Sequence, residues 1–271
     1  MNPDFIELRE GEEKLNPLPS MFTLCNAICG FMAILLTLNA YPSHVGVPPM
    51  AVWMIFGAMF FDVFDGLTAR LLDARSMHGM NLDSLADAIS FGLAPALFIH
   101  VEGMSLMLRH DFPLLVIWIL PGLYLVCALW RLAVYNTRSV LGIEEEGHIA
   151  FVGLPSPAAA GMVACMLWLL PQIEFDALTH FLFYFFYSLI AALLMVSTVT
   201  YPHLRNVCAR LPRGLTFLII FSALALVVRF GLMALVLLAH LYLLSTPLGR
   251  WASKWLDVRE NGLAEVGSFR D

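Results

Sequence analysis

Long apolar runs alternate along the chain with short polar connections that contain glycine or proline. Eight runs are long enough, or nearly so, to cross a membrane as helices, because a span needs about 20 largely apolar residues. They cover residues 19–39, 50–72, 81–101, 113–134, 155–173, 177–197, 214–229 and 231–246. The pattern predicts an all-α integral membrane protein, a polytopic bundle of six core transmembrane helices plus a C-terminal pair. The last two runs meet at residues 229–231, so they form either a tight helical hairpin or one long broken helix.

The basic residues indicate how the bundle is oriented. The chain has 15 Lys and Arg residues, and such residues gather on the cytoplasmic side of membrane proteins. With the N-terminus in the cytoplasm, eight spans leave only Arg109 and Arg229 outside and the other 13 inside. We therefore expect an inner-membrane protein whose termini are both cytoplasmic. Its expected parts are an acidic N-terminal segment (1–18), a transmembrane core (19–200), a C-terminal transmembrane hairpin (201–248) and a tail (249–271).

Composition excludes several classes of protein. Of the 271 residues, 60% are hydrophobic and 13% are charged, whereas soluble domains have about 45–50% and about 25%. An ordinary soluble enzyme is therefore excluded. The formal net charge of −6 argues against a nucleic-acid partner, because nucleic-acid-binding domains are normally basic. The five cysteines form no CxxC pair and lie mostly in apolar runs, so we expect buried thiols.

Four aspartates stand out inside, or at the edge of, the second and third apolar runs: Asp62, Asp65, Asp83 and Asp87. One carboxylate at the centre of a bilayer costs roughly 2.5–3.5 kcal/mol on insertion scales. Four unpaired carboxylates would cost on the order of 10 kcal/mol by the same scales. Only Arg70 is close enough in sequence to pair with them, so a structural ion-pair network does not explain the cluster. We infer a functional site.

The spacing of the aspartates predicts that they meet. Asp62 and Asp65 are three residues apart and Asp83 and Asp87 are four apart, so each pair shares one helix face. The connection from residue 71 to 79 is short, so we expect the two helices to be antiparallel neighbours. Four gathered carboxylates need about two divalent cations for neutrality. Oxygen ligands favour Mg²⁺, Mn²⁺ or Ca²⁺ over zinc, and we expect Mg²⁺ or Mn²⁺.

Small residues near the aspartates indicate room for a ligand. Gly66, Ala69 and Gly79 leave bare backbone on the acidic faces, and Arg70 follows one of them. Asp62 is about 12 residues, or roughly 18 Å, into its span, which puts the cluster in the cytoplasmic half near the depth of a lipid phosphate. Metal ions, an arginine and a cleft at that depth favour phosphoryl chemistry on a lipid diphosphate.

These residues resemble a known motif. Eight positions (Asp62, Asp65, Gly66, Ala69, Arg70, Gly79, Asp83 and Asp87) match, at their spacing, every fixed position of the CDP-alcohol phosphotransferase motif. Residues 18–26, 83–95 and 151–158 resemble the membrane-embedded phosphatidylserine synthase branch of that family. The resemblance covers about residues 16–205. Two places differ from the branch: Val134 and Tyr135 stand where it often has a basic residue and Phe, and Thr198 and Thr200 replace basic residues.

The resemblance implies roles for the motif residues. The aspartates Asp62, Asp65 and Asp83 would bind the metal ions, and Asp87 would share metal contact with general-base work. Gly66 and Ala69 would face the cytidine nucleotide, with Arg70 near its phosphates. The implied reaction is attack of the L-serine hydroxyl on the phosphorus that bears diacylglycerol in CDP-diacylglycerol, which gives phosphatidylserine and CMP. The family also implies a homodimer.

Other polar residues of the spans are weaker candidates. Thr23 and Asn26, one turn apart on the first span, are candidates to contact the nucleotide, as is Gly79. Arg131 either binds an acceptor carboxylate or lipid phosphate, or anchors its helix at the interface. Ser156 either helps to seat serine or begins a kinked helix, and Ser84 is a similar candidate for the acceptor site.

Two alternative functions stay open at this point. The acceptor could be glycerol phosphate, inositol phosphate or another alcohol, although a phosphorylated acceptor would need more basic residues than the chain offers near the cleft. Intramembrane carboxylates also occur in cation transporters. The aspartates, however, cluster on one side of the bilayer instead of lining a path through it, which favours the transferase.

Overall fold

The computed structural model describes residues 17–40, 46–72, 76–109, 113–140, 150–202 and 213–244. The predicted N-terminal segment, apart from residues 17 and 18, and the predicted tail therefore lie outside the described residues. Helices dominate the described chain. In order, the elements are α1 (Pro17–Ala40), α2 (Pro49–Leu71), α3 (Met77–Asp87), the π-helix η4 (Ala88–Leu93), α4 (Ala94–Arg109), α5 (Leu114–Val140), β1 (Ala150–Val152), α6 (Ser156–Leu169), the 3₁₀ turn η5 (Leu170–Gln172), α7 (Ala177–Val196), β2 (Thr200–Pro202) and α9 (Arg213–Phe230).

Five helices among the described residues are long and apolar enough to cross a membrane: α1, α2, the continuous run Met77–Leu108, α5 and α7. This fits an integral membrane protein. The predicted count of six core spans plus a pair is not confirmed, because α6 has only 14 residues before it tightens into η5 at Pro171. At 1.5 Å per residue α6 is about 21 Å long, shorter than a hydrocarbon core of about 30 Å.

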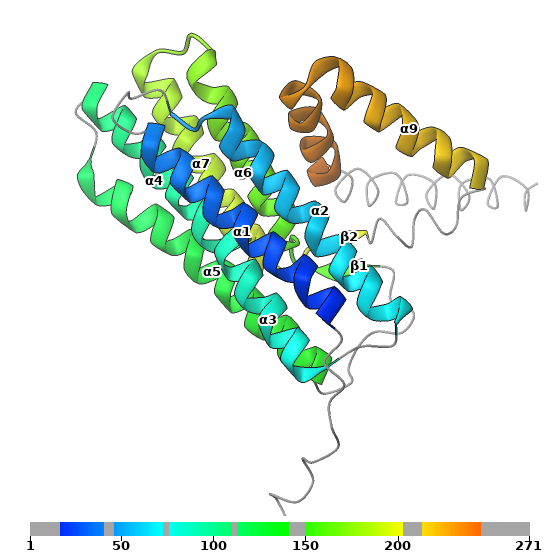
Figure 1. Cartoon of the computed structure of the whole chain (residues 1–271). Coiled ribbons are helices and arrows are strands. Elements are labelled where there is room, and N and C mark those ends of the chain that lie inside the picture. The colour runs from blue at the N-terminus through cyan, green and yellow to red at the C-terminus, as the bar shows by residue number, and fades with distance from the viewer. Residues whose placement is uncertain are drawn as a thin grey trace, which may run out of the picture.

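The C-terminal apolar region consists of two helices, α9 and a helix over Leu232–Leu244. They are separated at Gly231, whose φ of +58° is a left-handed conformation that glycine adopts without strain. Figure 1 shows the chain bending sharply after α9. The last helix packs on the bundle through Leu232 and Leu235, which are buried, whereas Phe217 and Phe221 of α9 are exposed.

The helices alternate in direction, so one end of the bundle collects the start of α1, the end of α2 and the start of α3 (Figure 1). A short antiparallel ladder of β1 and β2 lies at the same end, with Phe151 opposite Tyr201. Three-residue strands are too short to show an alternating pattern, so the sequence did not predict them. Gly153 follows β1 with φ +81°, and a Cβ there would lie 2.5 Å from the Met195 carbonyl oxygen. Only glycine fits this approach, which fixes where α6 begins.

The short connection between the two aspartate-bearing helices predicted that they would be neighbours. In the structure they are not packed on each other along their length. They run antiparallel (Figure 1), but α1 packs against both of them and they make few direct contacts. Gly30 of α1 explains how closely α1 approaches: a Cβ there would lie 2.6 Å from the Ser90 Cα. The Ser90 hydroxyl donates to the Asn26 carbonyl at 2.9 Å across the same contact. Helix α1 therefore separates the acidic helices by a fixed distance.

A π-helical turn follows Asp87 directly, and Pro95 gives its physical cause. Proline has no N–H and its ring clashes with the carbonyl four residues earlier, which here belongs to Phe91. The backbone widens instead, and the Ala94 N–H donates to the Ile89 carbonyl, five residues back. The Tyr124 hydroxyl of α5 donates to the Phe91 carbonyl at 3.3 Å, which satisfies it. Such turns often occur at functional sites.

A buried contact between a histidine and a carboxyl group joins α4 and α7 at the opposite end of the bundle. His180 Nε2 lies 3.1 Å from Glu102 Oε1, and the Glu102 side chain is 1% exposed. The second carboxylate oxygen of Glu102 is buried without a hydrogen-bond partner among the described residues. A Cβ at Gly46, which has a φ of +76°, would lie 2.8 Å from this oxygen, so the lack of a side chain there leaves room for the carboxylate.

We predict that His180→Ala lowers the melting temperature of the purified protein by several degrees. Removing the imidazole leaves the buried Glu102 carboxyl group without its hydrogen-bond partner, which costs about 1–3 kcal/mol. Leu178→Ala is the matched control, since Leu178 is on the same turn of α7 and is 60% exposed. Equal melting temperatures for the two variants would show that the pair does not stabilise the fold.

We predict a second packing effect for Gly30→Ala, which must push α1 away from η4. Overpacking of this kind costs about 1–3 kcal/mol, whereas the same substitution at Gly122 meets nothing within 4 Å and gains helix propensity. Thermal unfolding in detergent should show Gly30→Ala melting below the wild type and Gly122→Ala at or above it. A Gly30→Ala variant as stable as Gly122→Ala would contradict the close packing of α1 on η4.

Candidate active site

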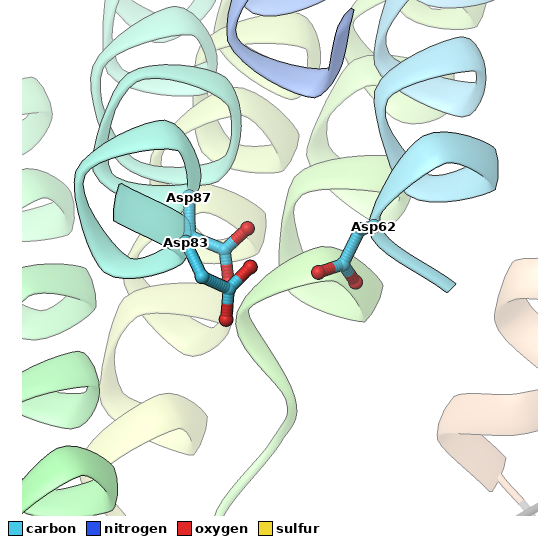
Figure 2. Close-up of side chains that lie close together, drawn as sticks. All are labelled: Asp62, Asp83 and Asp87. Carbon is cyan, nitrogen blue, oxygen red and sulfur yellow. The ribbon is translucent and has the colours of Figure 1, made fainter. Parts of the chain in front are cut away.

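Three aspartates from two helices face one another at the end of the bundle that holds the β1–β2 ladder. Asp62 belongs to α2, and Asp83 and Asp87 belong to α3; one carboxylate oxygen from each lies within 4.8 Å of the others. Figure 2 shows the Asp83 and Asp87 carboxylates directed across a gap toward Asp62. Asp62 is nine residues before the end of α2 and Asp87 ten residues after the start of α3, so both are about 15 Å from the helix ends.

The fourth motif aspartate, Asp65, lies outside this trio but next to it. Its side chain is close enough to interact electrostatically with Asp62 and Asp83 and approaches the Thr23 hydroxyl. Asp65 is 6% exposed. The sequence predicted that four carboxylates would meet; the structure brings three within ligand distance of a single point and leaves the fourth beside them.

Asn26 of α1 holds Asp87 in place. Its Nδ2 atom donates to Asp87 Oδ1 at 3.0 Å, and both side chains are buried. Asn26 is itself fixed by the Ser90 hydroxyl at its backbone carbonyl. Asn26 and Thr23 are the two predicted nucleotide contacts on α1, and that role stays a prediction. Thr23 lies beside Asp65, and its hydroxyl donates to the Pro19 carbonyl at 3.1 Å. Helix α1 thus orients both acidic helices.

The donor set fits a divalent cation of the Mg²⁺ class. Three buried oxygen atoms of the site have no hydrogen-bond donor among the described residues: Asn26 Oδ1, Asp65 Oδ2 and Asp83 Oδ1. Buried acceptors without donors are costly, and gathered carboxylates repel one another. A cation bound between α2 and α3 would remove both costs, and an all-oxygen site suits Mg²⁺ or Mn²⁺. The residues that would hold it are Asp62, Asp83 and Asp87, with Asp65 adjoining.

The small motif residues lie on the same two helices as this cluster. A Cβ added at Gly66 would meet nothing within 4 Å, so this face of α2 borders open space. Ala69 is half-buried and Arg70 is exposed in the last turn of the helix. Gly79 is in the first turn of α3, where its N–H donates to the Ser76 hydroxyl at 3.0 Å. The capping bond fixes the start of the helix that bears Asp83.

Arg131 of α5 lies near Asp87. Its Nη1 atom donates to the Ser156 hydroxyl at 3.1 Å, and Ser156 is fully buried at the start of α6. The guanidinium is close enough to Asp87 for their charges to interact. Its Nε–H is buried and has no acceptor among the described residues. Two of the three predicted acceptor residues, Arg131 and Ser156, therefore touch one another beside the carboxylates.

Ser84, the third predicted acceptor residue, is occupied by packing contacts. Its hydroxyl donates to the Met80 carbonyl at 2.9 Å and accepts from Asn136 Nδ2 at 2.6 Å. This bond ties α3 to α5. Asn136 was not predicted to contribute, although it is one and a half turns after Arg131 on the same helix, which is the signal that could have drawn attention to it.

Comparison with known proteins agrees with the motif. The family model described as CDP-alcohol phosphatidyltransferase matches residues 16–246. A protein named CDP-diacylglycerol–serine O-phosphatidyltransferase from Mycobacterium tuberculosis H37Rv is 32% identical over 89% of this chain and 81% of its own length. A protein of the same name from Bacillus subtilis is 33% identical over 71% and 93%. An archaetidylserine synthase from Methanothermobacter thermautotrophicus is 30% identical over 68% and 69%.

The family match covers most of the chain and includes both acidic helices, Arg131, Ser156 and the last described helix. It also extends past residue 205, where the resemblance seen in the sequence ended. With the carboxylate cluster, the open face at Gly66 and the family match in agreement, the chain belongs to the CDP-alcohol phosphatidyltransferase family.

Proposed function

We propose that this protein transfers the phosphatidyl group of CDP-diacylglycerol to L-serine in a divalent-metal-dependent reaction that releases CMP. One observation carries the proposal: the Asp62, Asp83 and Asp87 carboxylates lie within 4.8 Å of one another, and the hydrogen-bonded, partly buried Arg131–Ser156 pair lies near Asp87. A site that collects negative charge near a partly buried guanidinium suits a donor held through metal ions and an acceptor held through its own carboxylate.

The carboxylates and the small residues would bind the donor. Asp62, Asp65, Asp83 and Asp87 would hold up to two Mg²⁺ or Mn²⁺ ions, which when bound would neutralise the diphosphate and stabilise the departing CMP. The nucleotide would lie along the open face at Gly66 and Ala69, and the exposed Arg70 would reach its phosphates. Gly79 would leave room for it at the start of α3.

The acceptor would bind at Arg131. A guanidinium matches a carboxylate in shape and charge, and the Arg131 Nε–H is a buried donor with no partner among the described residues. Ser156 orients the guanidinium through Nη1. The names of the relatives from M. tuberculosis, B. subtilis and M. thermautotrophicus contain serine, either as acceptor or in the product, which favours an amino-acid acceptor over a phosphorylated alcohol.

The chemistry would use Asp87, which belongs to the carboxylate cluster and lies near Arg131. The serine hydroxyl oxygen forms a bond to the phosphorus that bears diacylglycerol, the bond from that phosphorus to the CMP oxygen breaks, and Asp87 takes the hydroxyl proton. Asn26 keeps the Asp87 carboxylate in the orientation that this transfer needs. Phosphatidylserine remains in the bilayer and CMP leaves to water.

We further propose that the site opens to the cytoplasm. The end of the bundle that holds the aspartates also holds the ends of α2, α5 and α7 (Figure 1). The sequence at and just after these helix ends carries five arginines: Arg70, Arg75, Arg138, Arg205 and Arg210. The positive-inside rule places that end in the cytoplasm, together with both termini. The homodimer implied by the family resemblance stays a prediction.

We predict that the purified protein releases CMP from CDP-diacylglycerol only when L-serine and Mg²⁺ or Mn²⁺ are present. EDTA should abolish the reaction, and Asp87→Asn should retain the fold while its turnover falls by a factor of about 10² or more, as for loss of a general base. CMP release and melting temperature would be measured together. Asp73→Asn is the control, because this residue is outside the motif.

The acceptor panel separates the alternatives. If glycerol phosphate or inositol phosphate supports CMP release and serine does not, the serine assignment is wrong although the family chemistry holds. Wild-type turnover in Asp87→Asn would remove its role as proton acceptor. Undiminished activity after EDTA treatment and dialysis would contradict the proposed metal dependence.

A further inference from the structure

The last described helix, Leu232–Leu244, is attached to the bundle by polar contacts near the site. His240 Nδ1 lies 2.7 Å from the Val236 carbonyl oxygen, so this nitrogen carries a proton. In the neutral ring Nε2 is then an acceptor, and the Tyr187 hydroxyl of α7 lies 2.9 Å from it. Together with the buried Leu232 and Leu235, this bond fixes the helix against the core, so its next turn has a defined position.

That next turn places Tyr242 against the β1–β2 ladder. The Tyr242 ring stacks on Tyr201 of β2, with centroids 5.9 Å apart and planes 29° apart. Tyr201 is 2% exposed and is paired with Phe151 of β1. Strand β1 leads through Gly153 to Ser156, the residue that accepts from Arg131. Tyr242 and Ser156 are therefore held by the same small ladder.

Tyr242 also lies near Arg131. The two side chains are close enough to interact electrostatically, as are Arg131 and Asp87. The guanidinium is thus hydrogen-bonded to Ser156 and lies within electrostatic reach of Tyr242 and of the general-base candidate Asp87. Its buried Nε–H, which has no acceptor among the described residues, indicates that a further acceptor, supplied by a ligand, completes the group.

We propose that Tyr242 forms a wall of the acceptor pocket and determines which acceptor fits between Arg131 and Asp87. The C-terminal helix is then part of the active site, although it lies more than 150 residues after the family motif and was assigned only a membrane-spanning role from the sequence. Tyr242 acts as a specificity-determining residue: its ring limits the length of an amino-acid acceptor whose carboxylate binds Arg131, and its hydroxyl supports the guanidinium. The inference rests on the proposed function.

The test compares Tyr242→Ala and Tyr242→Phe with the wild type in a steady-state assay of CMP release. We expect Tyr242→Ala to raise KM for serine about tenfold and Tyr242→Phe about threefold, because a polar neighbour of a buried charged group is lost. We expect kcat and KM for CDP-diacylglycerol to change less than about twofold, since the carboxylate cluster is untouched. Tyr242→Ala should also use longer hydroxyl amino acids, such as homoserine, better relative to serine.

Leu241→Ala is the matched control, because Leu241 is the preceding residue and is 52% exposed; it should keep wild-type constants. A wild-type KM for serine in both Tyr242 variants would overturn the proposal, as would a change confined to kcat and melting temperature. If Tyr242→Ala does not fold, Tyr242→Phe decides, since it keeps the ring and its stacking. Failure of the proposed function can be told apart from failure of the Tyr242 proposal, because in the first case the wild type itself would show no serine-dependent CMP release.

Discussion

Mutual repulsion among carboxylates buried in an apolar bundle is the constraint on which the rest of the structure depends. Asp62, Asp83 and Asp87 gather within 4.8 Å of one another in a helical protein where each such charge is expensive to insert. Bound cations would offset this repulsion and would also satisfy the three buried oxygens of the site that have no donor among the described residues. The surrounding contacts are explained by the need to hold these groups together: Asn26 bonds Asp87, and α1 keeps the acidic helices at a fixed separation.

The fold meets this constraint with local irregularities rather than with long ideal helices. Gly30 lets α1 approach Ser90 closely, and the π-turn before Pro95 changes the direction in which the chain leaves Asp87. Gly153 brings the β1–β2 ladder under the start of α6, so that Ser156 meets Arg131. These features hold the Arg131–Ser156 pair close to the carboxylate cluster, which is the arrangement that the proposed transfer between two substrates requires.

Much of this could be predicted from the sequence, because aspartates in apolar runs are rare and their spacing of three and four residues places them on helix faces. The family, the apolar helices and the convergence of Asp62, Asp83 and Asp87 follow from those two signals. For the break at Gly231 the sequence left two alternatives, a tight helical hairpin or one long broken helix. Three features could not be predicted: the π-turn, the β1–β2 ladder and the proximity of Tyr242 to Arg131. The strands have only three residues, which is too short for a periodic pattern, and the other two features depend on residues far apart in the sequence. The separation of α2 from α3 by α1 was missed for the same reason, since a short connection constrains helix ends and not helix packing.

The central claim is that α2 and α3 together hold divalent metal. Anomalous X-ray diffraction from crystals grown with Mn²⁺ tests it without reference to activity. The account predicts a manganese peak between the two helices, within about 2.5 Å of carboxylate oxygens from both, at Asp62 on one side and at Asp83 or Asp87 on the other. A fully occupied manganese elsewhere in the molecule, with none between these side chains, would contradict it.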